Sequence, residues 1–236
     1  MRATRWFPRL VTLAGVLTGC ATNPGRSPSD GIDHLVLAIS DLDRGIEQLG
    51  ELCGVAPVRG GEHGHAATEN ALLSMGSRAY LEVLAPVDGA QLPPELQPLR
   101  GVPDLLRVAW AIASGNADIT RRMLMSHGYG VSEPQPGSRV TDEGHTIRWR
   151  TFQLTAPRID GAPFFIEWDR ESPHPADTSP QGCPLQSIDL HTPQDEELRR
   201  LLRLLNVRGQ VTRAEVFRMV LKLEGSRFPV QIPAGS

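Results

Sequence analysis

A histidine and a glutamate occupy two apolar segments in which an ionisable side chain is unexpected. His34 lies in GIDHLVLAIS, and Glu82 lies in GSRAYLEVLAP. Burying a charge is unfavourable by several kcal/mol unless the group is paired or bound to a metal. Imidazole and carboxylate groups suit Zn, Fe, Mn or Ni, and a carboxylate can also act as a general base. The two residues therefore indicate a metal or acid–base site. The alternatives are a hydrogen-bonded core histidine and a glutamate on a solvated sheet face.

A third carboxylate follows the same pattern. Glu167 lies in PFFIEWD, which aligns with AYLEVLA through the shared glutamate. This alignment belongs to a threefold repeat, in which each unit has the order β-α-β-β-β. The units cover residues 31–87, 105–170 and 185–236. Units of this size do not close a core alone, so we expect them to pack against one another.

The first unit indicates which elements position the two ionisable residues. Residues 32–39 form an apolar run that predicts a strand with His34 inside it. Asp41 is a suitable N-cap for a following helix, and Gly54 is a suitable residue to end it. A later strand over 78–85 carries the glutamate. The sequence therefore predicts an α+β protein whose candidate site is built from strands.

The first twenty residues read as an export signal rather than as part of this fold. Three arginines and a short apolar run, LVTLAGVLTG, precede Cys20, and the run is too short to span a bilayer. LTGC resembles the lipobox of bacterial lipoproteins, in which the cysteine is lipidated; the alternative is an ordinary signal peptide with a chance cysteine. Residues 21–30 form a polar tether, and no aspartate follows Cys20 directly. We expect a lipid-anchored protein of the cell envelope, on the periplasmic face of an outer membrane.

Composition excludes some partners and leaves one question open. The chain has 236 residues and a formal net charge of −3, with no basic patch of interleaved aromatics, so we expect no nucleic-acid partner. Cys53 and Cys183 remain after the leader. In an oxidising compartment they can form a disulfide, but buried free thiols are equally compatible with the sequence.

Together these motifs resemble the glyoxalase-like branch of the vicinal oxygen chelate superfamily. The resemblance is carried by IDHLVLAISDLD, by the block GGEHGHAATENALLSMGSRAYLEVLAP, by PGSRV followed by IRWR, and by PFFIEWDRESPHP. It implies a glyoxalase-like domain over 31–170, made of the paired modules 31–87 and 105–170. Their curled, mixed sheets would form a cup with helices on its outer face.

The resemblance also implies a metal site. In metal-dependent members, the first and last strands of the modules hold a divalent metal that chelates two neighbouring substrate oxygens. His34, Glu82 and Glu167 stand at three of these ligand positions, and the two glutamates are also the candidate catalytic groups. Val108 stands near the fourth position and offers no ligand atom. The expected cofactor is therefore a divalent metal (Zn, Fe, Mn or Ni) held by an incomplete set of ligands.

Four further residues are candidates for contacts with a small-molecule substrate or the metal. Asn70 can line the mouth of the cup or form a turn. Arg139, in PGSR, can bind a substrate carboxylate in a bidentate manner or pair with a nearby acidic residue. Trp149 can line the cup or belong to its core. His63, in GEHGH, is a candidate extra ligand or a surface histidine.

Two functions of different classes follow. The first is a metal-dependent lyase, isomerase or dioxygenase that acts on a small oxygen-rich molecule. The second is a non-catalytic ligand-binding or scaffold module of the cell envelope that has lost the metal site. The third unit has Ser187 and Gln231 at the ligand positions, which favours the second function. This unit can pair with its counterpart in a homodimer or pack on the back of the other two, and the sequence leaves both arrangements open.

Overall fold

The computed structural model of the chain describes residues 31–64, 66–141, 143–224 and 230–232. The predicted leader, its lipidation residue Cys20 and the tether lie outside the described residues. Within the described part of the chain, no helix is long and apolar enough to cross a membrane.

Helix α1 (Leu42–Cys53) confirms the predicted start and stop signals. The side chain of Asp41 accepts a hydrogen bond from the backbone N–H of Arg44, and Gly54 ends the helix with a left-handed backbone at φ 71°. The helix lies on the outer face of the sheet, where Gly45 packs closely against Val83. A Cβ at position 45 would come within 2.6 Å of the Val83 side chain, so only glycine allows this approach.

The described strands of the two modules form one mixed, nine-stranded sheet. Its members are β1 (Ile32–Ala38), β2 (Val58–His63), β3 (Thr68–Gly76), β4 (Ala79–Pro86), β5 (Leu106–Ala113), β6 (Gly130–Val131), β7 (Gln135–Val140), β8 (Thr146–Ala156) and β9 (Phe164–Trp168). Their order is β6-β8-β7-β2-β3-β4-β1-β5-β9, and β8 also pairs with β9. The sheet thus closes on itself into a barrel, with β6 attached outside the ring at β8.

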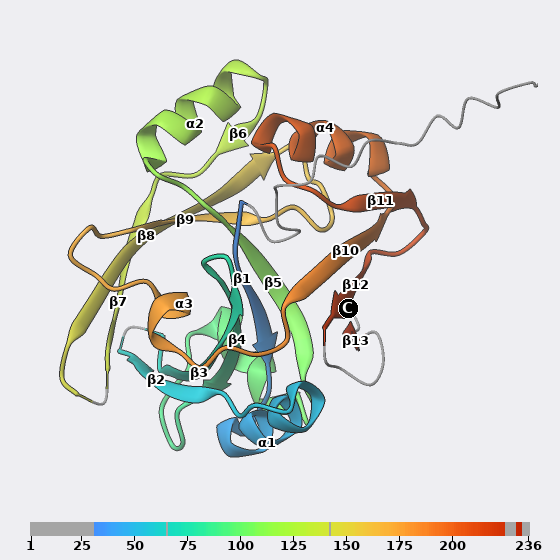
Figure 1. Cartoon of the computed structure of the whole chain (residues 1–236). Coiled ribbons are helices and arrows are strands. Elements are labelled where there is room, and N and C mark those ends of the chain that lie inside the picture. Colours follow the sequence, from blue (N-terminus) through green and yellow to red (C-terminus); the bar gives the residue numbers. More distant parts are fainter. Residues whose placement is uncertain (1–30, 65, 142, 225–229, 233–236) are drawn as a thin grey trace, which may run out of the picture.

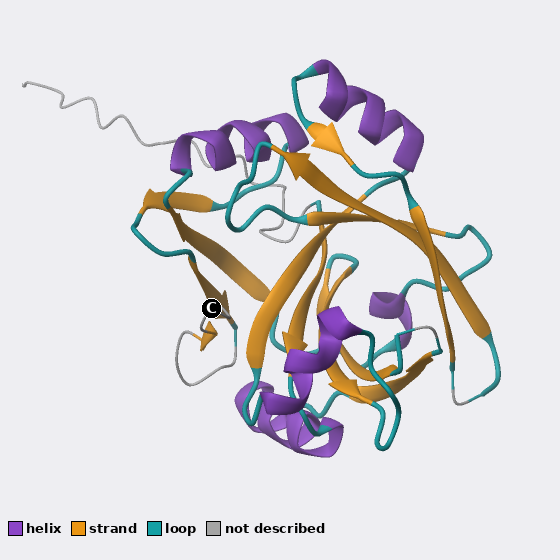
Figure 2. Ribbon diagram, turned by 180° about the vertical axis from the view of Figure 1, so that it is seen from behind, coloured by secondary structure: helices purple, strands orange, loops and turns teal. Residues whose placement is uncertain are grey.

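The helices lie outside this barrel (Figures 1 and 2). Besides α1, they are the 3-10 helix η1 (Pro94–Gly101) and α2 (Ala117–Ser126), whereas the short α3 (Pro175–Thr178) packs against β3 and β4. The two modules meet where β1 pairs antiparallel with β5, and again where Glu62 of β2 pairs with Val140 of β7. This arrangement confirms the predicted α+β class with a curled mixed sheet and helices on the outer face.

The third unit has the predicted order of elements but a different pairing of strands. It consists of β10 (Leu185–Thr192), α4 (Asp195–Leu205), β11 (Gln210–Arg213), β12 (Arg218–Leu223) and β13 (Val230–Ile232). In the first module, the first strand runs parallel to the last, β4. In the third unit, β10 runs parallel to β11 and antiparallel to β12. The third unit is therefore not a copy of the first module in its topology.

This unit packs on the barrel of the same chain. Its apolar residues belong to the same continuous core as those of the barrel. The ring of Phe217 lies so close to Gly161 that a Cβ there would meet it at 2.1 Å. The hydroxyl of Thr192 donates to the carbonyl of Asp160 at 2.9 Å. Of the two arrangements that the sequence left open, the structure shows packing against the first two modules.

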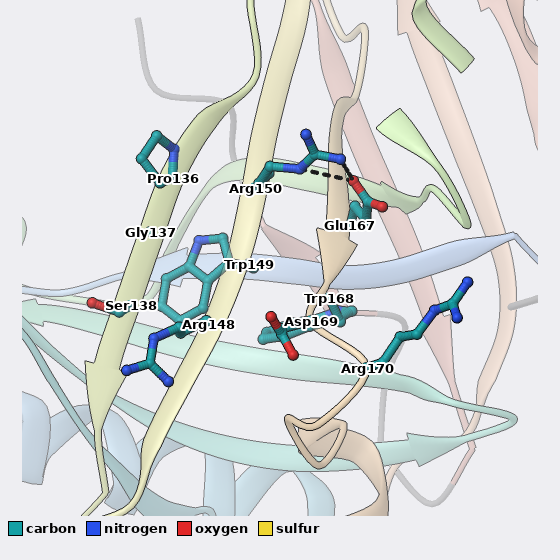
Figure 3. A pocket seen from close by; sticks show the side chains of 10 residues that line it. All are labelled: Pro136, Gly137, Ser138, Arg148, Trp149, Arg150, Glu167, Trp168, Asp169 and Arg170. Atoms are coloured by element: carbon teal, nitrogen blue, oxygen red, sulfur yellow. Dashed lines mark hydrogen bonds and ion pairs between the residues drawn. The ribbon is translucent and has the colours of Figure 1, made fainter. Parts of the chain in front are cut away.

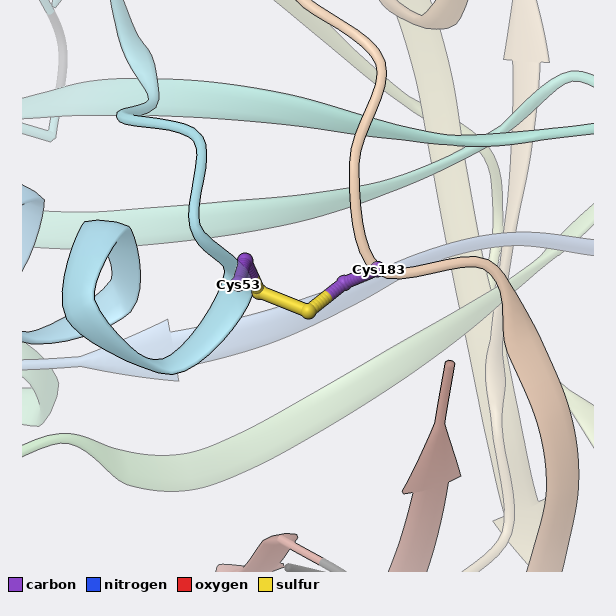
Figure 4. Close-up of a disulfide and its surroundings, with 2 residues drawn as sticks. All are labelled: Cys53 and Cys183. Atoms are coloured by element: carbon purple, nitrogen blue, oxygen red, sulfur yellow. A yellow bond between two sulfur atoms is a disulfide. The ribbon is translucent and has the colours of Figure 1, made fainter. Parts of the chain in front are cut away.

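A disulfide joins the end of α1 to the segment that leads into β10 (Figure 4). Cys53 and Cys183 lie 130 residues apart in the sequence, with their Cα atoms at 5.2 Å. Both cysteines are buried in the core. The bridge therefore ties the first module directly to the beginning of the third unit.

We expect the double variant Cys53→Ser, Cys183→Ser to unfold more easily than the wild type, by about 2–5 kcal/mol, because the open chain gains the entropy of a long loop. Urea unfolding followed by tryptophan fluorescence measures the difference. Reduced wild-type protein should match the double variant. Equal urea midpoints for the oxidised wild type and the double variant would contradict the prediction.

Candidate functional site

His34 and Glu82 meet on the inner face of the barrel. Strands β1 and β4 run side by side, with His34 opposite Tyr80 and Val36 opposite Glu82. Alternation along β4 directs Tyr80 and Glu82 to the same face. The Tyr80 ring stacks on the His34 imidazole at 4.7 Å, and Nε2 of His34 lies 3.6 Å from Oε2 of Glu82. The two ionisable residues of these apolar strands, His34 and Glu82, are therefore direct neighbours.

The carboxylate of Glu82 is the centre of this inner cluster. Its Oε1 accepts a hydrogen bond from Nδ2 of Asn70, on the adjacent strand β3, at 2.7 Å. The same oxygen lies 3.8 Å from Nε2 of His63, which comes from β2. The side chains of Glu82 and His63 keep 10% and 14% of their surface exposed, so solvent reaches the cluster. Four strands of one module thus converge on a single carboxylate.

A buried aspartate orients His34. Asp33 accepts hydrogen bonds from Nδ1 of His34 at 2.7 Å, from Nε1 of Trp168 at 2.9 Å and from Nε2 of His174 at 3.2 Å. A β-bulge against β5 falls at Asp33 and His34, and it relaxes the strict alternation that would separate two consecutive side chains. Burial alone would raise the pKa of Asp33, but the hydrogen bonds from His174 and His34 outweigh it and lower that pKa from 3.8 to about 2.

The ionised state of Asp33 fixes the tautomers around it. A carboxylate only accepts hydrogen bonds, so Nδ1 of His34 carries the hydrogen and, in the neutral ring, Nε2 presents a lone pair toward Glu82. In His174, Nδ1 accepts from the backbone N–H of Ala176, which leaves Nε2 as the donor to Asp33. His34 is thus held in one orientation by a residue outside the cluster.

His63 and Trp149 close another side of the cluster. Nδ1 of His63 lies 3.0 Å from the hydroxyl of Thr68, and the edge of its ring faces Trp149 at 5.7 Å. Burial lowers the pKa of His63 below its usual 6.5, and the carboxylate of Glu82 offsets only part of this effect. The indole of Trp149 leans across Gly137, where a Cβ would lie 2.3 Å from its Nε1. The sequence therefore needs a glycine at 137 to let the indole take this position.

The structure brings the three predicted substrate-binding residues to this part of the barrel. Asn70 binds Glu82, and Trp149 faces His63, as described above. Arg139 of β7 is 4% exposed, and its guanidinium donates to the carbonyl of Gly60. The sequence did not point to Asp33, Tyr80 or Trp168, whereas His63 was already a candidate extra ligand. A usable signal existed for the first of these, because an aspartate directly before His34 inside an apolar strand needs a buried partner.

The third predicted ligand, Glu167, lies on the other face of its strand. Phe164 contacts the His34 ring edge-on at 5.4 Å and so faces the interior. A residue three positions further along a strand faces the opposite side. There Glu167 accepts a hydrogen bond from Nε of Arg150 at 3.0 Å and from the backbone N–H of Ala117 at 3.2 Å. The structure therefore does not bring Glu167 to His34 and Glu82.

The predicted metal set does not fit this geometry. His34 and Glu82 meet, whereas Glu167 is engaged by an arginine and by the first residue of α2. Among the residues that the structure describes, no three histidine, cysteine, aspartate or glutamate side chains form a group that could hold a metal ion.

The comparisons with known proteins agree with the fold. The family model described as a glyoxalase-like domain matches residues 32–205. A hypothetical protein from Staphylococcus aureus has a similar structure, with a TM-score of 0.58 and 14% identity over 87% of this chain and 86% of that chain. The methylmalonyl-CoA epimerase of Mycobacterium tuberculosis reaches a TM-score of 0.43 at 22% identity, over 60% of this chain and 89% of that chain. No curated protein matches the chain.

The low pKa of Asp33 predicts a specific acid sensitivity. A carboxylate whose pKa is lower in the folded state stabilises the fold above its unfolded pKa of 3.8 and loses that effect as the pH falls through about 2. Between pH 4 and pH 2, the wild type should lose about 2 kcal/mol of unfolding free energy more than Asp33→Asn does. Urea unfolding of both proteins across this range measures the difference. The other carboxylates affect the two proteins equally, so their effects cancel. Parallel pH profiles would contradict the prediction.

Proposed function

This chain belongs to the glyoxalase-like domain family, and we propose that it binds a small oxygen-rich molecule inside the barrel, at the cluster of His34, His63, Asn70 and Glu82. The observation that carries the proposal is the position of Glu82. Its two oxygens face Nε2 of His34 at 3.6 Å and Nε2 of His63 at 3.8 Å, beside the hydrogen bond from Asn70. The family membership supports a small-molecule role for this interior.

The ligand chemistry follows from the hydrogen-bonding roles of these groups. Asp33 holds the hydrogen of His34 on Nδ1, so in the neutral ring Nε2 is an acceptor that faces a carboxylate oxygen of Glu82, also an acceptor, at 3.6 Å. Two facing acceptors are unfavourable without a donor between or beside them. A hydroxyl group of the ligand, placed beside both atoms, supplies that donor. Arg139 brings a buried positive charge to the same face of the barrel, which favours a molecule with a carbonyl or carboxylate oxygen.

The same pair supports a second candidate function, which is proton transfer. A carboxylate next to an oriented imidazole can remove a proton from a carbon beside a carbonyl group and return it. Asp33 would act as a positioning residue, because it fixes the ring of His34 without contacting the ligand. Glu82 would hold and move the proton, and an imidazolium at His34 would donate from Nε2 to the oxygen next to the reacting carbon, whereas the neutral ring has only an acceptor there.

One NMR experiment tests both functions. Lactate and pyruvate are the probes, in D₂O at neutral pD: saturation transfer reports binding, and exchange of the pyruvate methyl protons for deuterium reports proton transfer. We expect Glu82→Gln to reduce the exchange rate by at least about a hundredfold, as is usual for loss of a general base. We expect it also to weaken lactate binding, because the amide nitrogen repels donors.

Glu69→Gln is the matched control. Glu69 is the neighbour of Asn70 on β3, but it pairs with Arg59 at 3.0 Å on the opposite face. This variant should bind and exchange like the wild type. Binding without exchange would leave the binding function and remove the catalytic one. Saturation transfer that is equally strong in wild type and Glu82→Gln would overturn the proposed site.

We also propose that the protein is exported and anchored to the cell envelope through Cys20. The disulfide between Cys53 and Cys183 supports an oxidising compartment, because such bonds are rare in the cytosol of mesophiles. Cys20→Ala should move the protein from the membrane fraction to the soluble fraction of a Gram-negative host and abolish incorporation of labelled palmitate. Cys53→Ser should leave both readouts unchanged. Palmitate labelling that persists in Cys20→Ala would contradict the anchor.

A further inference from the structure

A second concave surface lies on the outer face of the barrel, over β7, β8 and β9 (Figure 3). It encloses a cavity of about 500 Å³, which is within the range of small-molecule sites. Arg148, Arg150, Arg170 and Asp169 are among its lining residues, together with Trp149 and Trp168. Trp149 also contacts His63 of the inner cluster, and Trp168 binds Asp33, so the same strands border both the cavity and the proposed inner site.

Strand alternation places the charged side chains on the outside. Trp149 faces the interior, because its ring contacts His63. Arg148 and Arg150 flank it on β8 and therefore project to the opposite face. Arg150 confirms this direction, since it binds Glu167 on the side of α2. A ligand in this cavity would therefore not contact Glu82 or His34.

The arginines of the cavity differ in whether they are neutralised. Arg150 is held by Glu167 and lies 3.9 Å from Asp118. Arg148 and Arg170, in contrast, form no ion pair with any carboxylate in the described part of the chain. The carboxylate of Asp169 is drawn between them in Figure 3, but it accepts a hydrogen bond from the backbone N–H of Glu171 rather than from either arginine. Two guanidinium groups thus remain available for an anion.

We propose that this cavity binds a small organic anion that also carries a hydroxyl group. Arg148 or Arg170, whose side chains point away from each other in Figure 3, would bind the anionic group, because a guanidinium group pairs with carboxylate and phosphate oxygens in a bidentate manner. Asp169 and Ser138 would accept or donate the hydroxyl hydrogen bond. The negative charge of Asp169 disfavours a bare, highly charged anion at the same point, so the hydroxyl is part of the specificity.

Isothermal titration calorimetry with the mature-length protein tests this site. Three probes are used: malate, succinate and glycerol 3-phosphate. Succinate is malate without its hydroxyl group, and glycerol 3-phosphate allows a direct comparison of phosphate with carboxylate. We expect malate or glycerol 3-phosphate to bind, and at least one of the variants Arg148→Gln and Arg170→Gln to weaken that binding by at least about tenfold. Asp169→Ala should reduce the preference for malate over succinate.

Arg158→Gln is the matched control. The Arg158 side chain is 91% exposed and pairs with Asp160, and it does not line the cavity. Unchanged affinity in Arg148→Gln and Arg170→Gln, equal weakening in Arg158→Gln, or no binding of any of the three probes would overturn the proposal. Loss of malate binding in Glu82→Gln with full binding in the arginine variants would place the anion inside the barrel. That result would sink the outer site and support the inner one.

Discussion

The buried carboxylate of Asp33 is the constraint on which the inner cluster depends. It is 1% exposed, and an isolated carboxylate at such a depth is unfavourable by several kcal/mol. Three donors offset this effect: His34 from the same strand, Trp168 from the end of β9, and His174 from the loop before α3. Each hydrogen bond to a charged group contributes about 1.5–3 kcal/mol, so the three together are large enough to offset the burial of the ionised carboxylate.

This network links segments that are far apart in the sequence. His174 and Trp168 lie more than 130 positions after Asp33, so their hydrogen bonds close the second module onto the first strand of the first. The orientation of His34 is a consequence, because its Nδ1 is committed to Asp33 and its Nε2 points at Glu82. The inner cluster is therefore arranged by the folding of the whole barrel. A change in β9 or in the loop after it would reach His34 through Asp33.

Local signals in the sequence were sufficient for the elements and for the pair of residues that matter most. Asp41 and Gly54 define α1 because capping is a property of a few adjacent residues. His34 and Glu82 were identifiable because each is an ionisable group inside an apolar run. The hydrogen-bond partners of Asp33 and the approach of His63 to Glu82 were not accessible, since they depend on a β-bulge and on pairing between strands. The disulfide likewise depends on a distance that only the folded chain sets.

The position of Glu167 shows why an alignment of letters is insufficient for strands. Aligning PFFIEWD with AYLEVLA on their glutamates assumes that both strands present that residue to the same face. In a strand, a shift of one residue exchanges the two faces. Phe164, Phe165 and Ile166 are apolar in succession, so the sequence contains no alternation that would fix the inner face of β9. In the barrel, the residue that reaches the inner network is Trp168, the next one along.

This one-residue difference has a consequence for the chemistry of both faces. With Trp168 inside, the interior receives a hydrogen-bond donor for Asp33 instead of a third carboxylate beside Glu82. With Glu167 outside, Arg150 is neutralised, and the remaining positive charge of the outer face is concentrated on Arg148 and Arg170. The absence of a third carboxylate inside and the charge distribution outside thus have the same origin in the register of β9. Because only the thickness of the sheet separates the two faces, any substitution that slips this strand by one residue must disturb both at once.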